Sequence, residues 1–181
     1  MNTNKIDNLM KSCFLPKIQM DNQYIHDLSY SNIIKFNPFL KSIGYKFKLG
    51  LGEWEKYGYL ALCDHQARTI QLKLPDTFLF GHELIHAYRD FKRLFTNEKA
   101  IEYWYNREEK KTYYAEEVIC DLGSLYISSI IDPNIIHSRI AWVKFLCEQH
   151  HGMCLTKDEY RLAKCHARQM AIDILRESSL V

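Results

Sequence analysis

The stretch that decides the fold is His82-Glu83-Leu84-Ile85-His86, which lies within a segment that has the residue pattern of a helix. Residues four positions apart lie on one face of a helix, so both imidazoles can reach one metal ion from a single rigid element. Glu83 directly follows the first histidine and can point at a water on that ion. Zinc-dependent hydrolysis requires this arrangement, in which two neutral nitrogens hold the ion and a carboxylate stands beside its water.

A second helix, expected from Thr112 to Ile131, offers the third protein ligand that a catalytic zinc site needs. Glu117 and Asp121 are four residues apart and therefore share a face. Glu117 would bind the metal, and Asp121 would accept a hydrogen bond from the far ring nitrogen of a ligand histidine. Glu116 points about 100° away around the helix and is the alternative ligand. We prefer Glu117 because it pairs with Asp121.

The order of the expected elements indicates an α+β fold, with strands before the histidine motif and helices after it. Three short segments rich in aromatic and aliphatic residues are separated by polar turns, which is typical of strands. We expect a small antiparallel sheet from Tyr45 to Leu51, Tyr57 to Cys63 and Thr69 to Leu74. The last segment alternates in polarity, which predicts one buried and one exposed face. Pro75 ends it.

Helical patterns fill the mainly helical C-terminal half. The motif helix should be capped by Asp76 or Thr77 and run to about Phe95. Thr156 and Glu159 form a capping box that opens the last helix. The other helices are expected at residues 5–14, 31–42, 98–110, 112–131 and 134–150. The chain has no internal repeat or linker, so we expect a single domain over residues 1–181.

The composition excludes several classes of function. The net charge is +2 and the charges are interspersed, which gives no footprint for nucleic acid or for an acidic membrane surface. No apolar segment approaches the roughly 20 residues of a membrane span. Residues 1–8 are polar and lack the apolar core of a signal peptide. We therefore expect a cytoplasmic protein, or one exported into a host cytosol by a route without a cleaved signal peptide.

The six cysteines include no C-x-x-C pair, and we expect them to be reduced and mostly buried. A second, structural metal site is one interpretation of the later part of the chain, with candidate ligands Cys147, His150, His151, Cys154, Cys165 and His166. The alternative is a helix end that carries small apolar cysteines and solvated histidines. The charged residues after the motif, Arg89, Asp90 and Arg93, are expected on the helix surface, although Asp90 could orient a ligand. The remaining histidines, including His65, are expected in surface or core positions.

Together, the stretch from His82 to His86 and the later Glu117 and Asp121 resemble the gluzincin group of zinc metallopeptidases. The residues from His82 to Tyr88 are locally similar to clostridial neurotoxin light chains, type III secreted effector metallopeptidases and a mitochondrial inner-membrane zinc peptidase. The resemblance implies a zincin-like fold that holds one Zn²⁺ per chain. The implied reaction is hydrolysis of peptide bonds, in which Glu83 is the general base that takes a proton from water and passes it to the leaving amine.

The resemblance also implies how a protein or peptide substrate would bind. The substrate would add an extended strand to the edge of the segment before the motif helix, along Thr69, Ile70, Gln71 and Leu72. The oxyanion that forms during hydrolysis needs a further donor besides the metal. Candidates are Tyr113, Tyr114, His137, Arg139 and His151.

Two other interpretations compete with the peptidase. One is a catalytically inactive regulatory or interaction module that keeps zinc and the zincin fold. The other is a helical interaction protein in which the motif arose by chance. Zinc content separates the helical interaction protein, which would hold no zinc, from the peptidase and the zinc-binding module. A substitution of Glu83 separates the enzyme from the binding module, because a binding role needs no base at that position.

Overall fold

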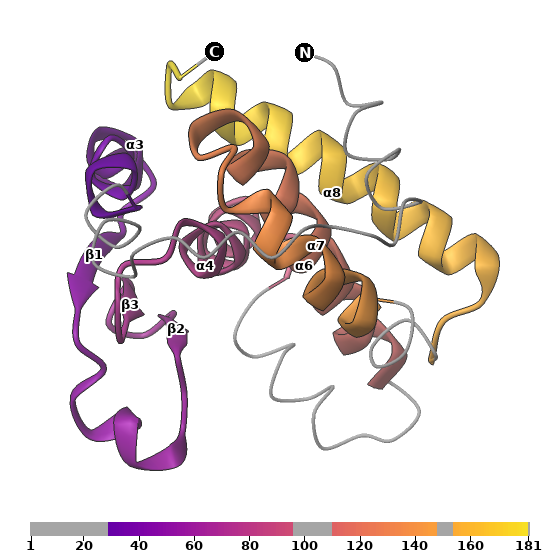
Figure 1. Cartoon of the computed structure of the whole chain (residues 1–181), viewed down its shortest axis with the longest axis horizontal. Coiled ribbons are helices and arrows are strands. Elements are labelled where there is room, and N and C mark those ends of the chain that lie inside the picture. Colours follow the sequence, from indigo (N-terminus) through magenta and orange to yellow (C-terminus); the bar gives the residue numbers. More distant parts are fainter. Residues whose placement is uncertain (1–28, 96–109, 148–153, 181) are drawn as a thin grey trace.

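The computed structural model describes residues 29–95, 110–147 and 154–180 and has an α+β architecture (Figure 1). A small sheet lies against α4, and the later helices pack together beyond it. The elements are α3 (Asn37–Ser42), β1 (Lys46–Leu49), the 3-10 helix η1 (Gly52–Tyr57), β2 (Ala61–Asp64), β3 (Thr69–Leu72), α4 (Thr77–Phe91), α6 (Lys110–Ile131), α7 (Ile136–Phe145) and α8 (Lys157–Glu177). The predicted order of strands followed by helices is confirmed.

The sheet is mixed, with strand order β1-β3-β2. β1 runs parallel to β3, with Lys46 opposite Thr69, whereas β2 runs antiparallel to β3, with Ala61 opposite Leu72. The prediction of an antiparallel sheet is therefore wrong for the β1–β3 pair. A tight turn joins β2 and β3 as a hairpin. The longer connection through η1 carries the chain past the place that β3 later fills, so β1 and β2 do not pair.

β3 is the central strand, and this position changes its burial. Thr69, Ile70 and Leu72 are buried and Gln71 is half-buried, so the predicted alternation of a buried and an exposed face is wrong within the strand. The Gln71 side-chain amide donates to Thr69 Oγ1 at 2.9 Å, which satisfies polar atoms on that covered face. Exposure begins at Lys73, after the strand has ended.

The motif helix α4 begins where the sequence predicts. Asp76 is its N-cap and accepts a hydrogen bond from the Leu79 N–H at 3.0 Å, and Arg139 of α7 pairs with the same carboxylate. The helix ends at Phe91, four residues before the predicted end, and Arg93 then adopts a left-handed φ of 56°. The predicted capping box of α8 is also present, between Thr156 and Glu159.

Other helix predictions are corrected or lie outside the described residues. The helix expected at 31–42 is interrupted by a turn at residues 35–36, which separates a helical segment at residues 29–34 from α3, because Pro38 lacks an N–H and starts a new helix. α7 covers Ile136–Phe145 and so begins two residues after the predicted start, and residues 148–150 of the predicted helix lie outside the described residues. The helices expected at 5–14 and 98–110 lie outside the described residues. Among the helices that the structure describes, none is long and apolar enough to cross a membrane.

Two glycines allow α4 and α6 to cross closely. A Cβ added at Gly81 of α4 would lie 2.6 Å from Ser124 Oγ and 3.3 Å from Ser124 Cα. A Cβ added at Gly123 of α6 would meet the Ile85 side chain and would lie 3.2 Å from the Ala167 carbonyl oxygen of α8. α6 is therefore the centre of the helical layer, packed against α4, α7 and α8. Gly81 immediately precedes His82, so this crossing also sets the position of the motif.

We expect Gly81→Ala to destabilise the protein. Overpacking of a tight contact costs about 1–3 kcal/mol, whereas the gain in helix propensity is about 1 kcal/mol. Chemical denaturation should show a lower free energy of unfolding, and the loss should be smaller in a Ser124→Ala background, which lacks the nearest atom. An unchanged free energy of unfolding in Gly81→Ala would contradict the close crossing.

Candidate metal centre

The two histidines of the motif face each other on the side of α4 that meets α6. The distance between His82 Nε2 and His86 Nε2 is 3.2 Å. Glu117 of α6 lies across from them, with one oxygen 3.5 Å from His82 Nε2 and the other 3.5 Å from His86 Nε2. Donor atoms on a tetrahedral zinc ion are about 3.3 Å apart, as follows from bonds of 2.0–2.1 Å. These three side chains therefore have the chemistry and spacing to hold one zinc ion.

Each imidazole turns its other nitrogen towards a carboxylate. His82 Nδ1 lies 2.9 Å from Asp121 Oδ1, which is the contact expected for Asp121. His86 Nδ1 lies 3.6 Å from Glu116 Oε1. Such partners fix the ring orientation and the tautomer, and leave Nε2 unprotonated for a metal. The arrangement supports Glu117 as the third ligand, and it gives Glu116 a different position, at the back of His86.

Arg89 holds Glu116 in this position. Its Nε donates to both Glu116 oxygens at 2.7 Å, and both residues are buried. The prediction that Arg89 is a helix-surface charge is therefore wrong. The physical reason is that α6 covers this face of α4, and a buried carboxylate requires a charged partner. Sequence reasoning missed the pair, although Arg89 lies three residues after His86 and so on a neighbouring part of the helix face.

The electrostatics favour positive charge between the two imidazoles. Burial alone would lower the pKa of His82, but its hydrogen bonds with Asp121 and Glu117 raise the pKa well above its usual range. His86 behaves likewise, since Cys120, Glu116 and Glu117 outweigh the effect of burial on its pKa. Burial would raise the pKa of Glu117, but the two histidines hold it well below its usual range. A divalent cation bound at this point would supply the positive charge that these carboxylates favour.

The side chain of Glu83, a residue of α4, lies on the side of the site that faces β2. Burial raises the pKa of its carboxyl, against the opposing effect of His82 and His86. A hydrogen bond from the Cys63 backbone N–H also lowers this pKa and places Glu83 next to β2. A carboxylate whose pKa is raised towards neutrality is better suited to exchange protons with a substrate.

The strand proposed to bind substrate does not have a free edge. β3, with Thr69, Ile70, Gln71 and Leu72, pairs with β1 on one side and β2 on the other. The expectation that these residues add a substrate strand is therefore wrong, since their backbone groups are already used. Within the described residues β2 pairs on one side only, and it packs against α4. Sequence order alone cannot show that the last strand inserts between the first two.

Of the candidate oxyanion donors, Tyr113 is the one that the described residues place at the site. Its hydroxyl hydrogen-bonds with Glu117, and burial together with that carboxylate raises the pKa of Tyr113. Tyr114 packs edge-on against Tyr113, with ring centroids 6.0 Å apart. Arg139 is instead paired with Asp76 at the start of α4. The His137 side chain and His151 lie outside the described part of the chain.

Asp90, one turn beyond His86 on α4, binds groups of the sheet. Its Oδ2 accepts hydrogen bonds from the Tyr45 hydroxyl at 2.9 Å and from Arg68 Nη1 at 3.1 Å. The Tyr45 oxygen also lies 2.8 Å from His65 Nδ1. The network joins the residue before β1 and the β2–β3 turn to α4. Asp90 is thus a positioning residue for the sheet, a role that required the tertiary contacts to recognise.

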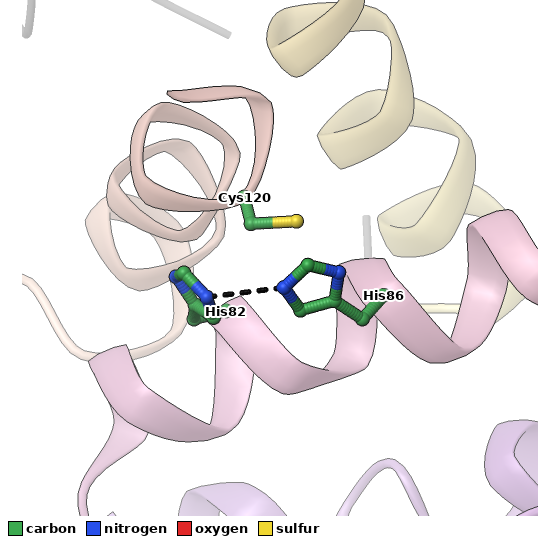
Figure 2. Close-up of side chains that lie close together, drawn as sticks. All are labelled: His82, His86 and Cys120. Carbon is green, nitrogen blue, oxygen red and sulfur yellow. Dashed lines mark hydrogen bonds between the residues drawn. The ribbon is translucent and has the colours of Figure 1, made fainter. Parts of the chain in front are cut away.

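Cys120 is a further residue that sequence reasoning left in the core. One ligand atom each from His82, His86 and Cys120 lie within 4.8 Å of one another, and the thiol reaches from α6 towards the imidazoles (Figure 2). The available signal was its position three residues after Glu117, on the same part of the helix face.

The second metal site predicted for the later part of the chain stays a prediction. Cys147 is buried, whereas Cys154 and Cys165 are exposed and His166 is also exposed. His150 and His151 lie outside the described residues. Exposed cysteines and histidines at these positions agree with the simpler interpretation of solvated side chains.

Comparisons of the chain with protein-family models, with curated proteins and with solved structures found no match. The zincin-like fold and the gluzincin resemblance therefore stay predictions, and the function must be argued from the geometry of this site.

We expect Glu117→Ala to weaken zinc binding more than Glu116→Ala does. Glu117 faces both Nε2 atoms, whereas Glu116 contacts Nδ1 of one histidine and is neutralised by Arg89. Zinc affinity measured by competition with a chromophoric chelator provides the comparison. A larger loss in Glu116→Ala would mean that the two carboxylates exchange roles when the metal binds.

Asp121→Asn should keep zinc but lower its affinity by about 10–100-fold, as is usual when the partner of a ligand histidine is changed. The amide keeps the size of the side chain and removes its charge, so the fold should be retained. Circular dichroism checks the fold, and chelator competition measures the affinity. Zinc affinity equal to that of the wild type would show that the Asp121–His82 contact does not support the metal.

Proposed function

We propose that this chain is a zinc-dependent endopeptidase, in which His82, His86 and Glu117 hold the ion and Glu83 is the general base. The observation that carries the proposal is the pair of facing Nε2 atoms, 3.2 Å apart, with the two Glu117 oxygens 3.5 Å from them. The carboxylates behind both rings add support, because metal-binding histidines usually have such partners.

A zinc ion held by these residues would supply Lewis-acid activation of a water and of the scissile carbonyl. Glu83 would accept the proton of that water and deliver it to the leaving amine. Its half-buried position beside the two histidines suits this task, since the loss of solvent raises its pKa. Tyr113 is the candidate hydrogen-bond donor to the oxyanion, because its hydroxyl lies against Glu117.

The edge of β2 that pairs with no strand in the described part of the chain is the proposed place for an extended substrate. β2 packs against α4, and the Cys63 N–H hydrogen-bonds to the Glu83 carboxylate. A peptide that adds to this edge by main-chain hydrogen bonds to residues other than Cys63 would run past the general base. The proposed substrate is accordingly an extended segment of a protein, located in the cytosol of the producing cell or of a host cell.

The intact Glu83 favours the enzyme over an inactive zinc-binding module. A module that only captures a partner gains nothing from a half-buried carboxylate next to its metal ligands, and removing a carboxylate from water costs free energy. The same residue gives the experiment that separates the two functions.

We expect the purified protein to contain one zinc per chain and to cleave protein substrates, and Glu83→Gln to keep the zinc and lose the cleavage. An amide cannot accept the water's proton, and removal of a general base costs roughly 10²–10⁴-fold in rate. New N-termini in a proteome treated with each protein measure cleavage, and elemental analysis measures zinc.

Glu53→Gln is the matched control, because the substitution makes the same chemical change away from the site. Glu53 lies on η1, and 79% of its side chain is exposed. Cleavage by Glu83→Gln at the wild-type rate would overturn the proposed mechanism. Stoichiometric zinc without cleavage by the wild type would favour the binding module, and absence of zinc would overturn both.

A further inference from the structure

Cys120 has polar neighbours that the proposed reaction does not explain. It lies on α6 between Glu117 and Asp121 and is fully buried in the core, and its thiol lies over the two imidazoles of α4 (Figure 2). A structural cysteine behaves as a small apolar residue and packs against apolar groups. The neighbours of this one include His86 and Glu116, whose Oε1 is 4.0 Å from the Cys120 sulfur.

The distances place the sulfur within reach of the same metal ion. One ligand atom each from Cys120, His82 and His86 lie within 4.8 Å of one another. Sulfur and nitrogen donors on a tetrahedral zinc ion are about 3.6 Å apart, as follows from bonds of about 2.3 and 2.0 Å. Coordination would therefore require separations of up to 4.8 Å between these ligand atoms to shorten to about 3.6 Å.

We propose that Cys120 is a reversible thiolate ligand of the metal held by His82 and His86, and that it occupies the position that the hydrolytic water needs. With Glu117, the ion would have four protein ligands, which is the closed arrangement of a structural zinc site. The resting enzyme is then held inactive by its own chain, and water enters when the sulfur leaves. The proposal rests on the metal site of the proposed function and adds its regulation.

The protons balance in both directions. A coordinating thiol is deprotonated by the ion, and its proton is released to solvent as the metal–sulfur contact forms. When water replaces the sulfur, the thiolate takes up one proton and becomes a neutral thiol again. The Glu116 carboxylate beside the sulfur can accept a hydrogen bond from the released thiol.

Cobalt(II) substituted into the full-length protein reports on this ligand directly, because a thiolate bound to cobalt produces an intense charge-transfer band in the near ultraviolet and nitrogen or oxygen ligands do not. We expect the band at one cobalt per wild-type chain and its loss in Cys120→Ser. Cys63→Ser is the matched control, since Cys63 is a half-buried thiol of β2 that is outside the group of His82, His86 and Cys120 and should keep the band. A Cys154→Ser/Cys165→Ser variant excludes the exposed thiols.

X-ray absorption at the zinc edge of the unaltered protein gives a test that does not depend on the folding of any variant. One sulfur neighbour at about 2.3 Å is expected beside nitrogen and oxygen neighbours. Cys120→Ser should also cleave substrate faster than the wild type, because the water position is no longer contested.

The outcomes distinguish this inference from the proposed function. A wild-type protein that binds one cobalt without the band, or zinc without a sulfur neighbour, overturns the role of Cys120 and leaves the peptidase proposal standing. A band that persists in Cys120→Ser also overturns it. Failure to bind either metal overturns the site as a whole.

Discussion

The site depends on the close crossing of α4 and α6. Packed helices commonly lie 8–10 Å apart, and the side chains at the contact set the distance. Here Gly81 meets Ser124, and Gly123 meets Ile85 and the backbone of α8, so the two helices approach without large side chains between them. Glu117 then reaches both histidines, and Asp121 reaches the back of His82. A wider crossing would leave the same residues on the same faces but too far apart to share an ion.

The crossing also buries charge, and the surrounding residues compensate it. A carboxylate removed from water costs several kcal/mol unless it is paired. Glu116 is neutralised by Arg89, Asp121 is paired with His82, and Glu117 lies between both histidines. Carboxylates therefore contact the imidazoles of His82 and His86 at both ring nitrogens. Asp90 connects the sheet to α4, because it accepts hydrogen bonds from Tyr45 and Arg68. These bonds help to keep β2 beside Glu83.

Local patterns predicted the elements that form from short-range contacts. The cap at Asp76, the capping box at Thr156, and the i, i+4 pairs His82–His86 and Glu117–Asp121 all concern residues within one or two helical turns. The strand order of the sheet was harder to predict from the sequence, since strand pairing joins segments that are far apart in the chain. The parallel β1–β3 pair, the central place of β3 and the burial of Thr69 all follow from a long-range insertion that sequence order does not encode. Arg89, predicted at the surface, was misplaced for the same reason.

By itself the sequence determined which residues lie on which face of each helix, and thus that two imidazoles and a carboxylate were available to one ion. Helix periodicity is a local property, so spacing is enough to establish it. Only the tertiary structure decided how those faces meet. It placed Glu117 in front of the rings and Glu116 behind His86, and it brought Cys120 to the imidazoles. It also made β3 the central strand, so that β1 and β2 each pair on one side only within the described residues. These relations depend on the distance and angle between segments far apart in the chain, which the packing of glycines and buried charges sets.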